Sequence, residues 1–199
     1  MTSEAYERKA MKKSLGAKTI VYPTPVFIIG TYDDQGRANA MNAAWGGVVS
    51  SGPPAVGVSV RKNRYTYANI QSRAAFTINI PSERHLIAAD YFGVVSGADV
   101  DKLTAAGLTT TKSQHVDAPI IVEFPFALEC RLLQVVEVGV HTQFIGEIIN
   151  IQADTSALDE KGHLDIERVQ PFLFAPGNLA YYGIGKQLSK AFTHGKAFG

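Results

Sequence analysis

The sequence predicts a mostly β protein, a β-rich α+β fold built on a six-stranded antiparallel barrel with Greek-key connections and a few short helices. Runs of β-branched and aromatic residues recur along the chain, and turn-forming residues separate them. The 199 residues include 18 glycines and 9 prolines, which suits many tight turns. The helical segments are few and short, so the regular strand–helix alternation of a parallel sheet is missing.

The strands are predicted from these runs in chain order. A polar, helix-prone arm is expected over residues 1–12, and one domain over residues 13–199. The first strand leads into the turn Asp33-Asp34-Gln35-Gly36, a strong hairpin signal. The predicted strands cover residues 26–32, 38–41, 55–60, 75–80, 127–138 and 142–153. A short strand and a Gly/Pro turn are expected within residues 171–184.

Three short helices are predicted between the strands. Thr66 is expected near the N-cap of the first, because a hydroxyl there can accept a free backbone N–H. Gly107 is expected to end the third, because glycine tolerates the left-handed backbone that closes a helix. The predicted helices cover residues 66–72, 82–90 and 99–106.

Charge and composition exclude several classes of protein. The net charge is +1, so the excess of cations that a non-specific nucleic-acid binder needs is missing, and we expect no nucleic-acid partner. Cys130 is the single cysteine, which excludes an internal disulfide. The apolar stretches are interrupted by prolines or charges, so we expect no membrane span. These features predict a cytoplasmic protein.

The common catalytic motifs are missing. No glycine-rich dinucleotide fingerprint follows a strand, no phosphate-binding P-loop is present, and no serine lies in a hydrolase elbow. The histidines have no metal-ligand spacing, so we expect no metal. No catalytic side chain is identified, and a bound cofactor is expected to carry the chemistry.

Two segments could bind such a cofactor. Residues 59–66 join a strand end to a helix start and bring cations and hydroxyls to one place, which suits a phosphate monoester. The alternative is a solvated basic turn, which is equally compatible with the residues. Residues 39–47 combine small side chains with Trp45, so the backbone could contact a flat heteroaromatic ring. The alternative there is a strand edge with a core tryptophan.

Two further candidates are ambiguous from spacing alone. Lys102 lies on a predicted helix, where an exposed lysine is the ordinary case, although a cation there could stabilise the negative charge of a reduced cofactor ring. His141 begins a long strand, and Glu147 follows it among apolar neighbours. The pattern does not separate a ligand-binding role from a structural one for either residue.

Read together, these segments resemble the flavin reductase-like family, whose fold is an FMN-binding split β-barrel, and within it the flavoredoxins. The resemblance runs from about Lys12 to Lys196. It rests on six segments in register: residues 13–18, 22–25, 39–45 (N-x-M-x-x-A-W), 61–67 (R-K-x-x-Y-T-Y), 96–102 and 141–147 (H-x-x-F-x-G-E).

The resemblance implies a homodimer with FMN near the subunit interface. It assigns Asn39 and Trp45 to the flavin and ribityl contacts, and it places Lys102 at the ring edge. With the motif reading, the cofactor-binding set is Asn39, Met41, Asn42, Ala43, Ala44, Trp45, Ser51, Arg61, Lys62, Tyr65, Thr66, Lys102, His141 and Phe174. In this set Arg61 and Lys62 would bind phosphate, Thr66 phosphate or ribityl, and Ser51 is a weaker candidate. Asn42 departs from relatives that often carry threonine.

Two functions of different class remain open from the sequence. The first is an electron carrier with tightly bound FMN, whose partner is another redox protein. The second is an NAD(P)H-dependent flavin reductase, in which a nicotinamide is a transient hydride donor. A barrel like that of pyridoxamine-phosphate oxidase fits the motifs less well. The flavin performs the redox chemistry in each case.

Overall fold

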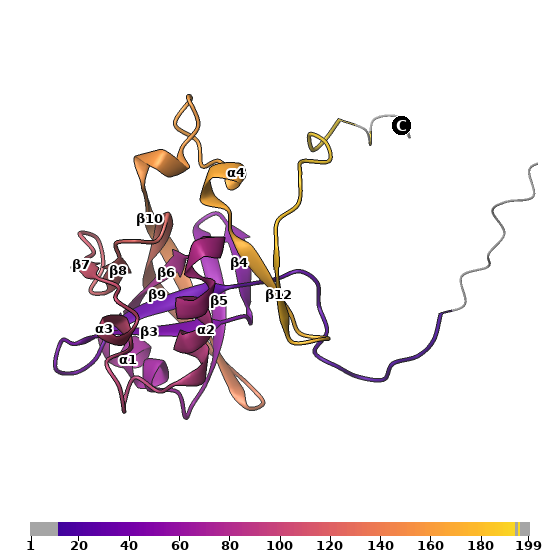
Figure 1. The fold of residues 1–199 in the computed structure, drawn as a ribbon. Helices are drawn as coiled ribbons and strands as arrows, with labels where there is room; N and C mark the ends of the chain where they lie inside the picture. The colour runs from indigo at the N-terminus through magenta and orange to yellow at the C-terminus, as the bar shows by residue number, and fades with distance from the viewer. Residues whose placement is uncertain (1–11, 194, 196–199) are drawn as a thin grey trace, which may run out of the picture.

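Seven strands form one antiparallel sheet in the order β3-β2-β6-β9-β10-β5-β4 in the computed structural model, which describes residues 12–193 and 195 (Figure 1). The outermost strands β3 and β4 do not pair, so the barrel is split along that seam. The strands are β2 (Phe27–Tyr32), β3 (Ala38–Ala43), β4 (Gly46–Ser51), β5 (Pro54–Arg61), β6 (Ala75–Ile80), β9 (Phe126–Val138) and β10 (His141–Ala153).

All six strands predicted ahead of the C-terminal segment belong to this sheet, and β4 is the additional one. Its sequence begins Gly46-Gly47, and glycine weakens the β signal because it has no side chain to pack. In the fold β4 pairs with β5, with Gly46 opposite Val58. The pairing therefore supplies the order that the local sequence lacks.

The predicted hairpin turn between β2 and β3 is present. The Asp33 carboxylate accepts the backbone N–H groups of Gln35 and Arg37 at 2.9 and 2.8 Å, and Gly36 takes a φ of +78°. An aspartate that bonds its own following backbone is the usual reason for such a turn. The polar arm predicted over residues 1–12 lies, except for Lys12, outside the described residues.

Two smaller sheets complete the β structure. A three-stranded sheet pairs β11 with both β1 and β12, and a two-stranded sheet pairs β7 with β8. The predicted strand and turn at the C-terminal end are thus a full hairpin, β11–β12. The bounds are β1 (Thr24–Pro25), β7 (Thr110–Lys112), β8 (Pro119–Ile121), β11 (Phe172–Ala175) and β12 (Ala180–Gly183).

The helices are short, as predicted, but their ends differ. Arg64 is the N-cap residue of α1 and makes no side-chain cap. Thr66 lies near the cap, as predicted, but it is buried in the first turn and is not the capping residue. Asp101 caps α3, and Gly107 follows its end at a φ of +66°, as predicted. The helices are α1 (Tyr65–Arg73), α2 (Leu86–Val94), α3 (Lys102–Ala105) and α4 (Ile166–Val169), with 3₁₀ turns η1 (Glu83–His85) and η2 (Thr155–Ala157).

Two apolar cores lie on opposite faces of β2. Ile29 packs with Phe76 and Phe144 between the strands, whereas Ile28 packs with Phe92 and other residues of the helical side. A Cβ at Gly146 would lie 2.6 Å from the Phe76 ring, so close packing requires glycine there. None of the helices in the described part of the chain has the length and apolar content needed to cross a membrane.

Candidate functional site

Two adjacent cavities form a cleft where the ends of β3 and β5 meet the start of α1. The larger has a volume of about 320 Å³ and the smaller about 110 Å³. Met41, Asn42 and Arg64 line both, so the two cavities share one wall. The cleft is therefore elongated, which suits a ligand with two chemically different ends.

The larger cavity is held in place by strand pairing. The β3–β4 corner carries Ala43, Ala44 and Trp45, and the Trp45 carbonyl accepts the Ser59 N–H at 2.8 Å. His141 lies opposite Arg61 in the pairing of β10 with β5. Segments far apart in the sequence thus meet at one edge of the sheet.

Asn42 lines the cleft, and a hydrogen bond made by its side chain fixes its position. Its Nδ2 donates to the Ala89 carbonyl of α2 at 2.9 Å. The amide side chain thus fastens β3 to α2.

The charges of the cleft have one sign. Arg61, Arg64 and Lys102 line it, and no carboxylate does. Across the described residues, no carboxylate lies within ion-pair distance of any of these three cations. The first turn of α1 contains no acidic residue either, so the positive end of its dipole is not neutralised. The cleft therefore favours an anionic ligand.

Asn39 and Thr66 form a buried polar pair at the back of the smaller cavity. Asn39 Nδ2 donates to Thr66 Oγ1 at 2.9 Å, and both side chains are at least nine-tenths buried. Asn39 Oδ1 has no hydrogen-bond partner among the described residues. A buried acceptor without a donor is costly. Because Asn39 lines the smaller cavity, a ligand bound there is the candidate source of that donor.

Lys102 is buried between α2 and α3 with only 4% of its surface exposed. Its Nζ donates to the carbonyls of Phe92 and Val95 at 3.2 and 3.3 Å. Burial lowers the pKa of Lys102 to about 8, and repulsion from Arg64 adds to that effect. The lysine holds the end of α2 and also presents a cation to the cleft.

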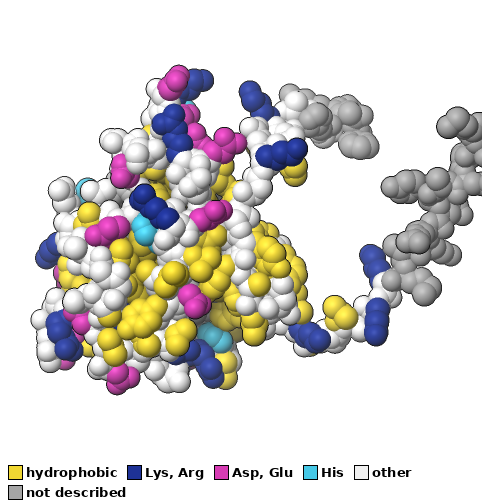
Figure 2. Space-filling view, in the orientation of Figure 1, with side chains coloured by type: hydrophobic (Ala, Val, Ile, Leu, Met, Phe, Trp, Pro, Cys, Tyr) yellow, Lys and Arg dark blue, Asp and Glu magenta, His cyan; other side chains and the backbone are white. Residues whose placement is uncertain are grey.

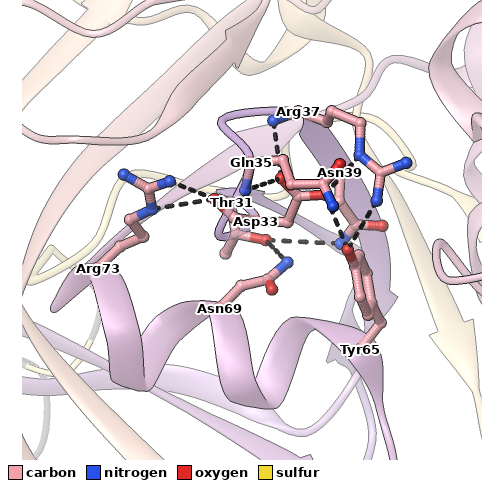
Figure 3. A network of polar contacts seen from close by, with 8 residues as sticks. All are labelled: Thr31, Asp33, Gln35, Arg37, Asn39, Tyr65, Asn69 and Arg73. Carbon is pink, nitrogen blue, oxygen red and sulfur yellow. Dashed lines mark hydrogen bonds and ion pairs between the residues drawn. The ribbon is translucent and has the colours of Figure 1, made fainter.

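Behind the cleft, Asp33 organises a network in which the charges are paired (Figure 3). Tyr65 Oη and Arg37 Nε donate to Asp33 Oδ2 at 2.8 and 2.7 Å. Burial alone would raise the pKa of Asp33, but the hydrogen bonds from Arg37 and Tyr65 outweigh it and lower the pKa to about 2. Arg73 of α1 donates to the Asp33 carbonyl and pairs with Asp117. This network locks the hairpin turn onto α1.

The structure brings together eleven of the fourteen residues in the predicted cofactor-binding set. The larger cavity is lined by Met41, Asn42, Ala43, Ala44, Trp45, Arg61 and His141. The smaller adds Asn39, Tyr65, Thr66 and Lys102.

Ser51, Lys62 and Phe174 lie outside the cleft of this chain. Ser51 is at the far end of β4, opposite Pro54. The Lys62 ammonium pairs with Glu137 at 2.7 Å, and Lys62 lines neither cavity. Phe174 packs against Tyr181 with ring centroids 5.6 Å apart. The roles predicted for these three residues stay predictions, and each residue contacts a neighbour that the local sequence does not reveal.

Sequence reasoning assigned no individual role to Arg64 or to the chain around Gly93, Val95 and Ser96. These residues complete the smaller cavity. The signal for Arg64 was present, since it belongs to the basic junction at residues 59–66. Within the described residues, no group of three or more His, Cys, Asp or Glu could hold a metal ion.

The fold and the cleft define a split-barrel protein of the flavin-binding class, and comparison with known proteins agrees. A family model described as the flavin reductase like domain matches residues 19–183, and the chain belongs to that family. This confirms the resemblance and the mostly β split-barrel fold.

Particular relatives can be named. The flavoredoxin of Desulfovibrio vulgaris (Miyazaki F) is 50% identical, with a TM-score of 0.89 over 93% of this chain and 100% of that one. A flavoredoxin from Methanosarcina acetivorans is 31% identical, with a TM-score of 0.89 over 95% of this chain and 100% of that one. An uncharacterized protein of Archaeoglobus fulgidus is 31% identical over 149 residues, 75% of this chain and 83% of its own length.

Proposed function

We propose that this protein binds FMN in the cleft and transfers electrons through it, as a flavoredoxin-like carrier. The observation that carries the proposal is the charge of the lining: Arg61, Arg64 and Lys102 face the cleft, and no carboxylate among residues 12–193 does. A phosphate monoester carries nearly two negative charges and would balance these cations. The 50% identity to a flavoredoxin supports the same ligand.

The residues present fit the other parts of FMN as well. Asn39 Oδ1 is a buried acceptor that a ribityl hydroxyl or a ring N–H could satisfy. Trp45 and Met41 supply apolar surface for a flat ring, and the backbone of residues 41–45 supplies main-chain polar groups. The cleft thus has a cationic part, a hydrogen-bonding part and an apolar part, which is the chemistry that FMN requires.

The chain contributes position and electrostatics to the redox reaction. When bound, FMN supplies the reversible uptake of electrons and hydride. Lys102 places a positive charge at the cleft, which would favour the more negative, reduced form of the ligand. Thr66 and Asn39 orient the ligand through fixed hydrogen bonds, because each is held by the other. No side chain is required to transfer a proton in this scheme.

We further propose that the protein works as a homodimer in the cytoplasm. Figure 2 shows apolar side chains gathered on the body next to the point where the terminal segments leave it. Leu188 and Phe192 of the C-terminal segment are 94% and 93% exposed in a single chain. Such side chains favour burial against a second copy. A cytoplasmic location is supported by the buried, unpaired Cys130.

Purification and reconstitution test the proposal. The protein should be yellow, release FMN on denaturation, and bind added FMN again after the flavin is removed. A colourless protein that cannot be reconstituted would overturn it.

An anaerobic experiment then identifies the electron donor. Bleaching of the flavin by dithionite or by a reduced ferredoxin, but not by NADH or NADPH, is expected for the carrier. Rapid bleaching by either nicotinamide would instead make the protein a flavin reductase, with the nicotinamide as transient hydride donor.

A further inference from the structure

The Asn42 side chain is held at the wall that the two cavities share. Asn42 lines both cavities, and its Nδ2 donates to the Ala89 carbonyl of α2 at 2.9 Å. A Cβ at Gly93, one turn further along α2, would lie 3.5 Å from the Asn42 Cβ. The amide thus packs along α2 with Nδ2 toward the helix. Because an amide carries its donor and its acceptor on different atoms, a fixed Nδ2 also fixes the direction of Oδ1.

Tyr181 of β12 is bound to the next residue of the same helix. Its Oη donates to Asp90 Oδ1 at 2.9 Å. Its ring packs against those of Phe172 and Phe174, with ring centroids 5.6 Å from each. Tyr181 lines neither cavity, so the phenol can act on a ligand in the cleft only through a neighbouring side chain.

That neighbour is Asn42. Burial and the Asp90 carboxylate raise the pKa of Tyr181 to about 12, and a hydrogen bond from the Asn42 side chain opposes part of that rise. A neighbour that lowers the pKa of a phenol through a hydrogen bond is a donor, and Nδ2 is the only donor atom of the amide. One N–H of Nδ2 therefore goes to Ala89 and the other to Tyr181.

The direction of these hydrogen bonds prevents the amide from turning over. Tyr181 gives its only proton to Asp90, so toward Asn42 the phenol oxygen can only accept. The Ala89 carbonyl is an acceptor as well. A reversed amide would place Oδ1 against two acceptors and leave them without donors. Nδ2 is therefore kept beside α2, and within residues 12–193 no donor bonds to Asn42 Oδ1.

We infer that Tyr181, together with Asp90, is a positioning residue of the cleft, which holds the Asn42 amide so that Oδ1 accepts a hydrogen bond from a donor group of the ligand. This rests on the proposed binding of FMN, whose ring N–H and ribityl hydroxyls are such donors. The β11–β12 hairpin thus takes part in ligand binding without touching the ligand, because its phenol fixes the orientation of an amide on β3.

A double-mutant cycle on the flavin-free protein tests the inference, with FMN affinity measured by fluorescence titration. Tyr181→Phe keeps the ring and its packing but removes the acceptor. It should weaken FMN binding by about threefold to tenfold, as expected for one neutral hydrogen bond. Asn42→Ala should weaken binding at least as much. In the Asn42→Ala background, Tyr181→Phe should change the affinity by less than about twofold, because no amide is left to position.

Variants of Asp90 give a second, independent measurement. Asp90→Ala frees the phenol proton and should reproduce the loss seen in Tyr181→Phe. Asp90→Asn keeps an acceptor oxygen for that proton and should restore most of the affinity. A direct effect of the Asp90 charge on an anionic ligand would instead make both variants bind FMN more tightly, because both remove a negative charge.

Tyr182→Phe is the matched control on the same strand. Tyr182 Oη accepts a hydrogen bond from Asn178 at 2.6 Å, and Tyr182 lines neither cavity. This variant should bind FMN like the unaltered protein. Urea denaturation of each variant shows whether its folded state is retained at the conditions of the titration.

The outcomes separate positioning from structure. An affinity of Tyr181→Phe within about twofold of the unaltered protein would overturn the inference. An equal loss with and without the Asn42 side chain would overturn it too, because the phenol would then act independently of the amide. Failure of the unaltered protein to bind FMN would instead overturn the proposed function itself.

Discussion

The hairpin network and the cleft lie side by side at the start of α1, and they treat charge in opposite ways. Tyr65 belongs to the network and bonds to Asp33, whose carboxylate also accepts Arg37. Arg64, the residue before it, faces the cleft, whose lining includes no carboxylate from the described part of the chain. One peptide bond thus separates a region whose charges are paired from one whose charges are not.

The difference teaches where stability and binding come from in this fold. The buried Asp33 carboxylate and its hydrogen-bond partners hold the turn and α1 together, and removing the carboxylate leaves those partners without their charged acceptor. Unpaired cations lower the stability of the fold. A ligand that binds them stabilises the folded state and offsets that loss. We therefore expect substitutions in the network to change the free energy of unfolding and substitutions in the cleft to change ligand affinity.

The largest effect is expected at the centre of the network. Asp33→Asn should lower the free energy of unfolding by about 2–3 kcal/mol at pH 7, because Arg37 and Tyr65 lose a charged acceptor that is only 2% exposed. FMN affinity should change far less. Urea denaturation measures the first quantity, and Asp34→Asn, an exposed neighbour, is the matched control. An equal loss in both variants would contradict a special role for Asp33.

The same aspartate predicts a pH dependence. Its pKa is lowered to about 2 in the folded protein, so the unfolded chain binds the proton first as the pH falls. The stabilisation is complete above about pH 4 and is lost between about pH 4 and 2. Urea denaturation at pH 7, 4 and 3 should show the difference between Asp33→Asn and the unaltered protein shrinking at the lowest pH.

A smaller effect, on ligand affinity rather than on stability, is expected for Arg61→Met in the cleft. Loss of one phosphate contact should weaken FMN binding by about 1.5–3 kcal/mol, and the free energy of unfolding should hardly change, because Arg61 is exposed. Fluorescence titration of the flavin-free protein measures the affinity. Arg84→Met is the matched control outside the cleft, and a similar loss in that variant would point to net charge rather than to a contact.

Lys102→Met tests the electrostatic role of the cleft. Removing the cation should lower the flavin reduction potential by about 30–60 mV at pH 7, which corresponds to about 1.4–2.8 kcal/mol for a two-electron couple. Because the pKa of Lys102 is lowered to about 8, the lysine is mostly neutral at pH 9.5, and the shift in reduction potential should be smaller at that pH. Anaerobic reduction against a reference dye measures it. An unaltered potential would remove Lys102 from the flavin environment.

The smallest effect is expected for Lys62→Met. Its ammonium pairs with Glu137 rather than facing the cleft, so FMN affinity should change by less than about threefold. Titration beside Arg61→Met makes the comparison direct. A loss as large as that of Arg61→Met would return Lys62 to the phosphate, as the sequence suggested, and would break the contrast between paired and unpaired charges.

Much of the barrel was predictable because its signals are local. Local sequence runs predicted the strands β2, β3, β5, β6, β9 and β10. Asp33 and Gly36 predicted the turn between β2 and β3. β4 was not predictable from Gly46-Gly47, because only its pairing with β5 orders it. Most of the cleft was predicted too, since residues 39–45 and 61–66 are two short segments whose chemistry is concentrated in sequence.

The sequence by itself therefore determined the fold class, the family and the two segments that meet in the cleft. Only the tertiary structure decided which cations line the cleft. It paired Lys62 with Glu137, placed Arg64 between two cavities with no ion-pair partner among the described residues, and buried Lys102 against the end of α2. The physical reason is that a side chain's charge acts through its neighbours in space, and those neighbours come from strands and helices far away in the chain.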